Sequence, residues 1–319
     1  MQRKVKNYIL SLESMGDVVE SFLALQKATS PIIFITNNLY VCLLEKINKN
    51  EHINFVGVNS SNKFRLIMDL ILKIRKPNKI IICHRNKILS RVLRLLFPLS
   101  SIFKLKYPHE NVQGLIYKST RNRYIQYSML YRASGISLSE KVYELIDCKL
   151  DNKKAIFAVG GGNNVAPLGA RGGKHILSLC KYIKENFDEI ETLYLIGKGD
   201  DDLRISKYVQ EYFINIEVVN LVDKIELADL HEYLLSSSQF FSFDSGLMHL
   251  SCFYNTNKYF VFGPTNPSIV LPMCFEYNIL GQFGDCINCY NPDDGVHSPT
   301  YKCIDSTCTK IMVNDDESS

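Results

Sequence analysis

Residues 8–28 read YILSLESMGDVVESFLALQKA, and they contain the first strand, turn and helix of a pattern that the rest of the chain repeats. An apolar run of strand length comes first, and Gly16 then permits a tight turn. From Val18 to Ala28 the apolar residues recur at helical spacing, which predicts a helix. The same alternation continues along the first half, with strands predicted at Ile32–Thr36, Ile53–Val58 and Lys79–Cys83 and helices at Leu39–Ile47 and Phe64–Ile74.

The second half restarts this pattern after the polar segment Asp147–Lys154, which we interpret as a linker. Apolar strands separated by helices are typical of parallel sheets covered on both faces. We therefore predict an α/β protein of two Rossmann-like domains, residues 1–150 and 151–319, facing each other across a cleft with the functional loops at the strands' carboxyl ends. In the second half, strands are predicted at Ala155–Val159, Thr192–Ile196, Ile216–Asn220, Gln239–Phe243 and Lys258–Phe262, and helices at His175–Asn186, Leu203–Phe213, Glu226–Ser236 and Leu247–Tyr254.

Length and composition exclude several classes of protein. The 319 residues are 46% apolar and 22% charged, which excludes a disulfide-stapled miniprotein, a collagen-like repeat and a disordered chain. No secretory signal or membrane-spanning run is visible, so we expect a cytoplasmic protein. The net charge of +4 conceals an asymmetry, because residues 1–150 carry 24 basic and 10 acidic residues whereas residues 151–319 carry 13 and 23.

The turn Ser14-Met15-Gly16-Asp17 follows the first predicted strand, and Asp17 stands where the helix begins. Two interpretations of Asp17 stay open. Aspartate is common as a helix cap, and the spacing alone favours that role. A carboxylate at this strand end is also placed to act as a general base in the cleft.

Two strand-end loops of the second half offer contacts for an anionic ligand. The glycine-rich stretch that contains Gly161 and Gly162 can bring backbone N–H groups close to a phosphate, with Arg171 or Lys174 to neutralise its charge. A plain loop is the equal alternative. Asp200, with Asp201 and Asp202, opens a helix, where either ribose hydroxyls or the helix dipole accounts for the carboxylates.

The most specific stretch is Phe243-Asp244-Ser245-Gly246-Leu247-Met248-His249-Leu250, which follows one strand and opens a helix. Backbone N–H groups around Ser245, Gly246 and Leu247 are expected to point at a diphosphate, with the helix dipole favouring its charge. His249 lies one turn into the helix. Both a core histidine and a direct ligand contact fit that position, and the core role is favoured.

Together these motifs resemble glycosyltransferase family 9, the heptosyltransferases that build the inner core of lipopolysaccharide. The resemblance rests on Ser14–Val18, Asp244–Leu250 and Phe262-Gly263-Pro264-Thr265-x-Pro267, and it covers nearly the whole chain. It implies a GT-B fold and inverting transfer from a nucleotide-activated sugar, with ADP-heptose favoured. It also implies that Asp17 is the general base and that the turn from Asp244 to Leu247 binds the donor diphosphate.

The chain departs from the family at the donor loop. That loop usually carries a basic residue followed closely by Trp-Pro, whereas this chain contains no tryptophan. The resemblance implies that no catalytic metal is required, because helix N-termini and cationic side chains hold the leaving group. We expect the donor to contact Gly161, Gly162, Arg171, Lys174, Asp200, Asp201, Asp244, Ser245, Gly246, Leu247 and His249.

Four of the ten cysteines crowd the C-terminal region, within residues 286–308. The pairs Cys286-x-x-Cys289 and Cys303-x-x-x-x-Cys308, with thirteen residues between them, have the spacing of a four-thiolate metal knuckle. The cluster also resembles that of the autotransporter-modifying heptosyltransferases, in which a four-cysteine iron site is part of the structure. We predict a structural Zn or Fe ion, with four free thiols, or adventitious disulfides formed on purification, as the alternative.

A long basic segment lies in the first half. From Leu70 to Ser139 there are 14 lysines and arginines and a single acid, Glu110. Solvated helix faces are the ordinary explanation. An acceptor site for phosphorylated lipid A–core sugars and contact with the anionic inner leaflet are the functional ones, and Arg85, Lys87 and Arg91 are the acceptor-binding candidates. We exclude nucleic acid, because no aromatic platform is interleaved with these cations.

These observations predict an inverting glycosyltransferase that moves a heptose from a nucleotide-diphosphate donor to a hydroxyl of a lipopolysaccharide, capsule or other glycan. A protein hydroxyl is the alternative acceptor within the family. A non-catalytic nucleotide-binding or membrane-docking scaffold is the alternative from another class. Peripheral contact of a cytoplasmic protein with the inner membrane is compatible with both.

Overall fold

The computed structural model describes residues 7–60, 62–83, 87–104, 122–140, 144–160, 173–262, 266–273 and 275–280. The chain divides into two compact units, Met1–Glu144 and Leu145–Ser319, here called unit 1 and unit 2. Each unit is built on its own parallel β-sheet. Among the described residues, no helix combines the length and the apolar character needed to cross a membrane.

Unit 1 has a five-stranded sheet in the order β3-β2-β1-β4-β5. The chain lays down β1, β2 and β3 in one direction and then returns to the other side of β1 for β4 and β5, which is the Rossmann arrangement. The strands are β1 (Asn7–Leu10), β2 (Ile32–Asn37), β3 (Ile53–Val58), β4 (Lys79–Ile82) and β5 (Ser101–Lys104), and the helices are α1 (Met15–Leu25), α2 (Asn38–Ile47), α3 (Lys63–Lys73), α4 (Lys87–Leu96) and α5 (Arg123–Ala133).

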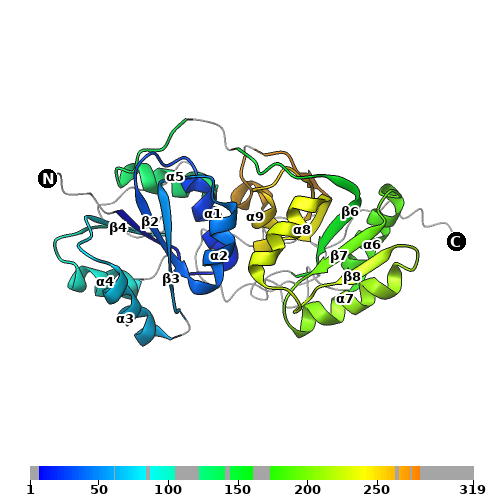
Figure 1. The fold of residues 1–319 in the computed structure, drawn as a ribbon, viewed down its shortest axis with the longest axis horizontal. Coiled ribbons are helices and arrows are strands. Elements are labelled where there is room, and N and C mark those ends of the chain that lie inside the picture. Colours follow the sequence, from blue (N-terminus) through cyan, green and yellow to red (C-terminus); the bar gives the residue numbers. More distant parts are fainter. Residues whose placement is uncertain are drawn as a thin grey trace. The chain divides into compact units, whose positions relative to one another are not determined.

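Different helices cover the two faces of this sheet (Figure 1). Tyr8 and Leu10 of β1 pack in one cluster with Leu70 of α3 and Leu93 of α4. On the other face Phe22 of α1 packs edge-on against Phe55, with 5.3 Å between the ring centroids. Helix α5 packs against α1. Because both faces are covered, the strands are apolar throughout rather than alternating.

Unit 2 has a six-stranded parallel sheet in the order β11-β10-β9-β6-β7-β8. Helices α6 and α7 cover one face around Phe157, Leu195 and Phe241, and α8 reaches the other face, where Tyr233 contacts Tyr194. The strands are β6 (Asp151–Ala158), β7 (Thr192–Ile196), β8 (Glu217–Asn220), β9 (Ser237–Phe243), β10 (Asn257–Val261) and β11 (Asn278–Ile279), and the helices are α6 (Gly173–Asn186), α7 (Asp200–Tyr212), η1 (Leu227–Asp229), α8 (Leu230–Ser236), α9 (Gly246–Ser251) and α10 (Pro267–Val270).

The structure adds elements that the sequence pattern did not predict, namely α4, β5, α5, α10 and β11. In α5 the buried positions are largely tyrosines, including Tyr127 and Tyr131, which an apolar count underweights. The predicted linker Asp147–Lys154 is also partly wrong, because β6 begins at Asp151. Its first residues lie at the exposed amino end of the strand, where polar side chains are compatible with the sheet.

A buried carboxylate ties together two strand-end loops of unit 2. The Asp202 Oδ2 atom accepts a hydrogen bond from the Lys198 backbone N–H at 2.9 Å. A Cβ atom added at Gly160, after β6, would lie 2.5 Å from the same oxygen, and one added at Gly197, after β7, would lie 2.8 Å from it. Packing against Asp202 therefore requires glycine at both positions, and Asp202 belongs to the structure of these loops.

Replacing Gly160 by alanine should destabilise unit 2 by about 2 kcal/mol, because the new methyl group displaces Asp202 from its hydrogen bond. Urea unfolding, monitored by circular dichroism, measures this loss of stability. In an Asp202→Ala background the same replacement should cost less than about 1 kcal/mol, since the clashing carboxylate is gone. An equal loss in the two backgrounds would contradict the contact.

Candidate functional site

In unit 1 the order in which strands are added to the sheet reverses between β1 and β4, and this point positions the candidate site residues of unit 1. The two strands are neighbours in register, with Leu10 beside Ile82. From β1 the chain enters α1, which carries Asp17, and from β4 it runs toward α4. Ligands of open α/β sheets bind outside the carboxyl ends of the strands at such a reversal. Asp17 therefore lies where this fold binds ligands.

The Asp17 carboxylate is held through both of its oxygens. Ser14, the N-cap residue of α1, donates its hydroxyl to Asp17 Oδ2 at 2.6 Å. The Nη1 atom of Arg123 donates to Asp17 Oδ1 at 3.0 Å. The cap position of α1 is thus occupied by Ser14, while Asp17 lies in the first turn, with its carboxylate paired to the first residue of α5.

Arg123 also pairs with a second carboxylate of α1. Its Nη1 atom lies 3.2 Å from Glu20 Oε2, and the Glu20 side chain is fully buried. Asp17 and Glu20 are three residues apart, so they lie on the same face of the helix, and one guanidinium reaches both. The sequence pattern did not predict a role for Glu20 or Arg123. The available signal was an acidic residue within the apolar stripe of α1.

Neutral polar side chains lie beside the ion pairs of Arg123 with Asp17 and Glu20. The Cys83 Sγ and the Tyr131 hydroxyl are 3.2 Å apart, and the Tyr131 hydroxyl donates to the Ser21 carbonyl at 3.0 Å. Burial raises the pKa of Cys83 to about 12. Burial also raises the pKa of Tyr127, and the carboxylates of Asp17 and Glu20 raise it further. The thiol and the phenols are therefore uncharged near neutral pH.

In unit 2 the corresponding reversal lies between β6 and β9, where Ala158 is in register with Ser242. The turn after β9 is ordered by its serines. Ser245 caps α9 by accepting from the Met248 N–H at 3.2 Å, and its hydroxyl lies 3.2 Å from that of Ser242. Around this cap Asp244, Gly246 and Leu247 are half-buried.

The other described donor candidates have different surroundings. His249 is buried in α9. Asp200 and Asp201 are exposed at the start of α7, and Asp201 pairs with Arg204 at 3.2 Å. Exposed pairs of this kind contribute little to stability. Both aspartates follow β7, which neighbours β6, so they lie at the same edge of the sheet as the Ser245 turn.

Several predicted site residues lie outside the described residues: Gly161, Gly162, Arg171, Arg85, Cys286, Cys289, Cys303 and Cys308. Lys87 is the first residue of α4 and Lys174 is the second residue of α6, and at both positions the structure describes the backbone alone. Arg91 is exposed on α4. Within the part of the chain that is described, His, Cys, Asp and Glu side chains form no group of three or more that could hold a metal ion.

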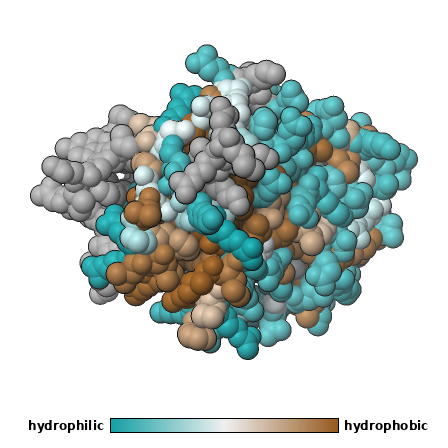
Figure 2. Space-filling model, turned by 60° about the vertical axis from the view of Figure 1, so that its left-hand side comes forward, coloured by the Kyte–Doolittle hydropathy of each residue, from teal (hydrophilic) through white to brown (hydrophobic). Residues whose placement is uncertain are grey.

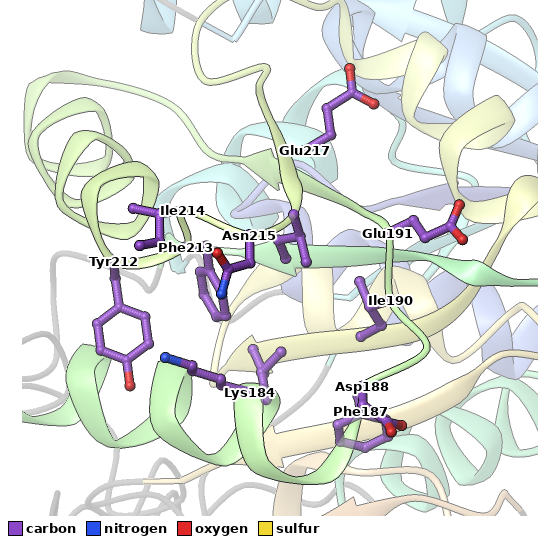
Figure 3. Close-up of a pocket in the computed structure, with 12 residues that line it drawn as sticks. Lys184, Phe187, Asp188, Ile190, Glu191, Tyr212, Phe213, Ile214, Asn215 and Glu217 are labelled. Carbon is purple, nitrogen blue, oxygen red and sulfur yellow. The ribbon is translucent and has the colours of Figure 1, made fainter.

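A pocket of about 430 Å³ lies elsewhere in unit 2, between the ends of α6 and α7 and the starts of β7 and β8 (Figure 3). Lys184 reaches toward Tyr212, with its Nζ 5.7 Å from the ring centroid. Asp188, Glu191 and Glu217 also line the pocket. It lies at the amino edge of the sheet and carries three carboxylates, so it does not suit an anionic diphosphate.

No protein-family model matches this sequence, and a search of curated proteins finds no match. Several solved structures have a fold similar to that of this chain. The glycosyl transferase family 9 protein of Veillonella parvula is 17% identical, with a TM-score of 0.63 over 86% of this chain and 85% of that one. The ADP-heptose lipopolysaccharide heptosyltransferase II of E. coli is 13% identical, with a TM-score of 0.66 over 89% and 92%.

A third similar structure is the iron-containing dodecameric glycosyltransferase TibC of enterotoxigenic E. coli. It is 11% identical, with a TM-score of 0.53 over 98% of this chain and 74% of that one. At such low sequence identity, structural similarity establishes the fold and not the function. The chain has the GT-B fold of these glycosyltransferases, and at the level of the fold both the predicted architecture and the resemblance to glycosyltransferase family 9 are confirmed.

Proposed function

We propose that this protein is a glycosyltransferase that moves a sugar, with heptose favoured, from a nucleoside-diphosphate donor to a hydroxyl of a glycan acceptor with inversion. The observation that carries this proposal is the Asp17 carboxylate, fixed by Ser14 and Arg123 at the strand reversal of unit 1. The likeness in fold to enzymes named as heptosyltransferases supports the choice of reaction.

Asp17 would act as the general base. Each carboxylate oxygen has two lone-pair sites, so the hydrogen bonds from Ser14 and Arg123 leave room for an acceptor hydroxyl. As that hydroxyl attacks the anomeric carbon, its proton passes to Asp17. The bond from the anomeric carbon to the diphosphate breaks on the opposite side, and the nucleoside diphosphate leaves. A single displacement of this kind inverts the anomeric centre.

Arg123 would position the base. Its guanidinium fixes the direction of the Asp17 carboxylate, because the same Nη1 atom also binds the buried Glu20. Its contribution is orientation, since a reacting group held in the correct geometry avoids the entropy cost of finding it.

The donor diphosphate would bind to unit 2. Residues 151–319 carry an excess of ten acidic residues, so the anion has to be held by local donors. The backbone N–H groups of the ordered turn at Ser245 and Gly246 are the described candidates, with Arg171 and Lys174 as the cations. Asp200 and Asp201 would accept from the ribose hydroxyls. A phosphorylated glycolipid or glycan would complement Arg85, Lys87 and Arg91 as acceptor.

The four C-terminal cysteines would hold a structural metal ion. Cys286, Cys289, Cys303 and Cys308 provide four thiolates, a ligand set that suits zinc or iron. The fold is also similar to that of a protein described as iron-containing. A metal there would stabilise a segment rich in Asn, Asp, Gly and Pro by tying its ends together.

The Asp17→Asn variant should lower the transfer rate about 10²- to 10⁴-fold, because an amide does not take the acceptor proton. Release of ADP from ADP-heptose in the presence of a lipopolysaccharide-core acceptor measures this rate. The affinity for the donor, measured by thermal shift, should change by less than about twofold. The matched control is Asp188→Asn, which removes a carboxylate at the amino edge of unit 2 and should leave the rate unchanged.

Unchanged turnover in Asp17→Asn would eliminate Asp17 as the base. A separate outcome bears on the whole proposal. If the unaltered protein binds ADP-, GDP- or UDP-sugars yet releases no nucleoside diphosphate with any of them, it is a non-catalytic scaffold that has kept the fold.

Elemental analysis of protein purified without chelator should find about one equivalent of zinc or iron per chain, since four thiolates complete one tetrahedral site. The Cys286→Ser/Cys289→Ser variant should lose it. The control is Cys42→Ser, which removes an exposed free cysteine of unit 1 and should retain the metal. Trace metal in the unaltered protein would point to four free thiols.

A further inference from the structure

Helices α3 and α4 of unit 1 carry apolar residues on two faces. The inner face of α3 presents Leu66 and Leu70 to the core of unit 1, and the inner face of α4 presents Leu89 and Leu93 to the same cluster. An amphipathic helix of a globular protein carries polar residues on its opposite face. On α3 and α4 the face turned away from the core is also apolar.

The outer face of α3 exposes Phe64, Met68, Ile71 and Leu72, which recur at helical spacing. The outer face of α4 exposes Ile88 and Leu95, and Leu99 follows in the turn after the helix. Exposure is nearly complete at the end of this series, at 83% for Leu95 and 99% for Leu99. We call these seven residues the α3–α4 surface.

Figure 2 shows a continuous apolar area on the side of unit 1 that Figure 1 draws with α3 and α4. Single exposed apolar side chains are ordinary on protein surfaces. A contiguous patch that joins two helices and a turn is a mark of an interaction site.

The charges around the α3–α4 surface are almost all positive. Exposed cations on the two helices and the turn between α3 and β4 are Lys63, Arg65, Lys73, Arg75, Lys76, Arg91 and Arg94. The one acid between residues 62 and 104 is Asp69. Its carboxylate accepts from the Asn59 N–H at 2.9 Å and lies 3.7 Å from the Lys73 ammonium, so its charge is already engaged within unit 1.

We propose that the α3–α4 surface docks on an anionic lipid bilayer. Apolar side chains on helices that lie flat can enter the boundary between headgroups and acyl chains, while flanking lysines and arginines contact the lipid phosphates. Leu99, at the tip of a turn, is placed to insert furthest from the helices. A second copy of this chain is a poorer occupant, because a symmetric contact would bring two identical cationic rims together.

This surface lies wholly within unit 1. Its cationic rim shares Arg91 with the proposed acceptor contacts, so the variants below leave Arg91 unaltered. A loss of vesicle binding and a loss of transfer are measured separately, so failure of one does not decide the other.

Cosedimentation of the full chain with lipid vesicles tests the proposal. The unaltered protein should bind vesicles of phosphatidylglycerol and phosphatidylcholine, and it should bind vesicles of phosphatidylcholine alone at least tenfold more weakly. Raising the salt from about 0.1 M to about 1 M should weaken binding, because the screening length falls from about 10 Å to about 3 Å.

Two variants separate the apolar and the charged contributions. Leu95→Ser/Leu99→Ser should lower the partition coefficient about tenfold or more, since both side chains lose their burial in lipid. Arg65→Gln/Arg94→Gln should lower binding to the anionic vesicles about tenfold and leave binding to phosphatidylcholine unchanged. The matched control is Ile214→Ser in unit 2, which removes an isoleucine that is 82% exposed and should change nothing.

The substituted side chains point into solvent, so circular dichroism and thermal unfolding should match the unaltered protein. Absence of binding to the anionic vesicles by the unaltered protein would overturn the proposal, as would unchanged binding by Leu95→Ser/Leu99→Ser. Sedimentation velocity without lipid gives a further test. Self-association that this variant abolishes, in a protein that ignores vesicles, would assign the surface to a second copy instead.

Discussion

The organisation of unit 1 depends on the ion pairs that the Arg123 guanidinium forms with two carboxylates of α1. It pairs with Asp17 and with Glu20, which are 106 and 103 residues away in the sequence, and Glu20 is fully buried. Removing one partner of a buried ion pair costs about 3–5 kcal/mol, because the other charge is left without compensation. The need to keep Glu20 paired with Arg123 therefore fixes how α5 lies against α1. It also sets the rotation of α1, and with it the direction of the Asp17 carboxylate at the end of β1.

A related device organises unit 2. Asp202, near the start of α7, is buried against Gly160 and Gly197, which follow neighbouring strands. Both units bury a carboxylate of a helix that follows a strand. Asp202 lies beside the carboxyl ends of β6 and β7, where it holds loops that the parallel sheet has already gathered at one edge. Glu20 lies in the middle of α1 and holds α5. The two carboxylates differ in what they need. Glu20 is met by a cation from a distant helix, whereas Asp202 accepts from a backbone N–H four residues before it.

The fold was largely predictable from the sequence, because parallel strands covered on both faces are apolar throughout. The bounds of β3 and β7 match their predictions, and the position of Asp17 at a strand end followed from the order of the elements. Arg123 was not predictable, because α5 buries tyrosines and its partners are far away in the chain. Asp202 could not be told from Asp200 and Asp201, since burial of one carboxylate in a run of three depends on tertiary packing. Helix α3 was predicted, but with apolar residues on two faces its sequence did not reveal which face the core would cover.

In the proposed mechanism Arg123 acts through Asp17. A double-mutant cycle on the transfer rate tests this directly, with Asp17→Asn, Arg123→Lys and the two combined, the lysine being chosen because it keeps a positive charge beside Glu20. If Arg123 serves to position the base, the combined variant should be no slower than Asp17→Asn alone, and Arg123→Lys by itself should lose about tenfold or more. Additive losses in the combined variant would show that Arg123 contributes independently of Asp17, and would contradict its positioning role.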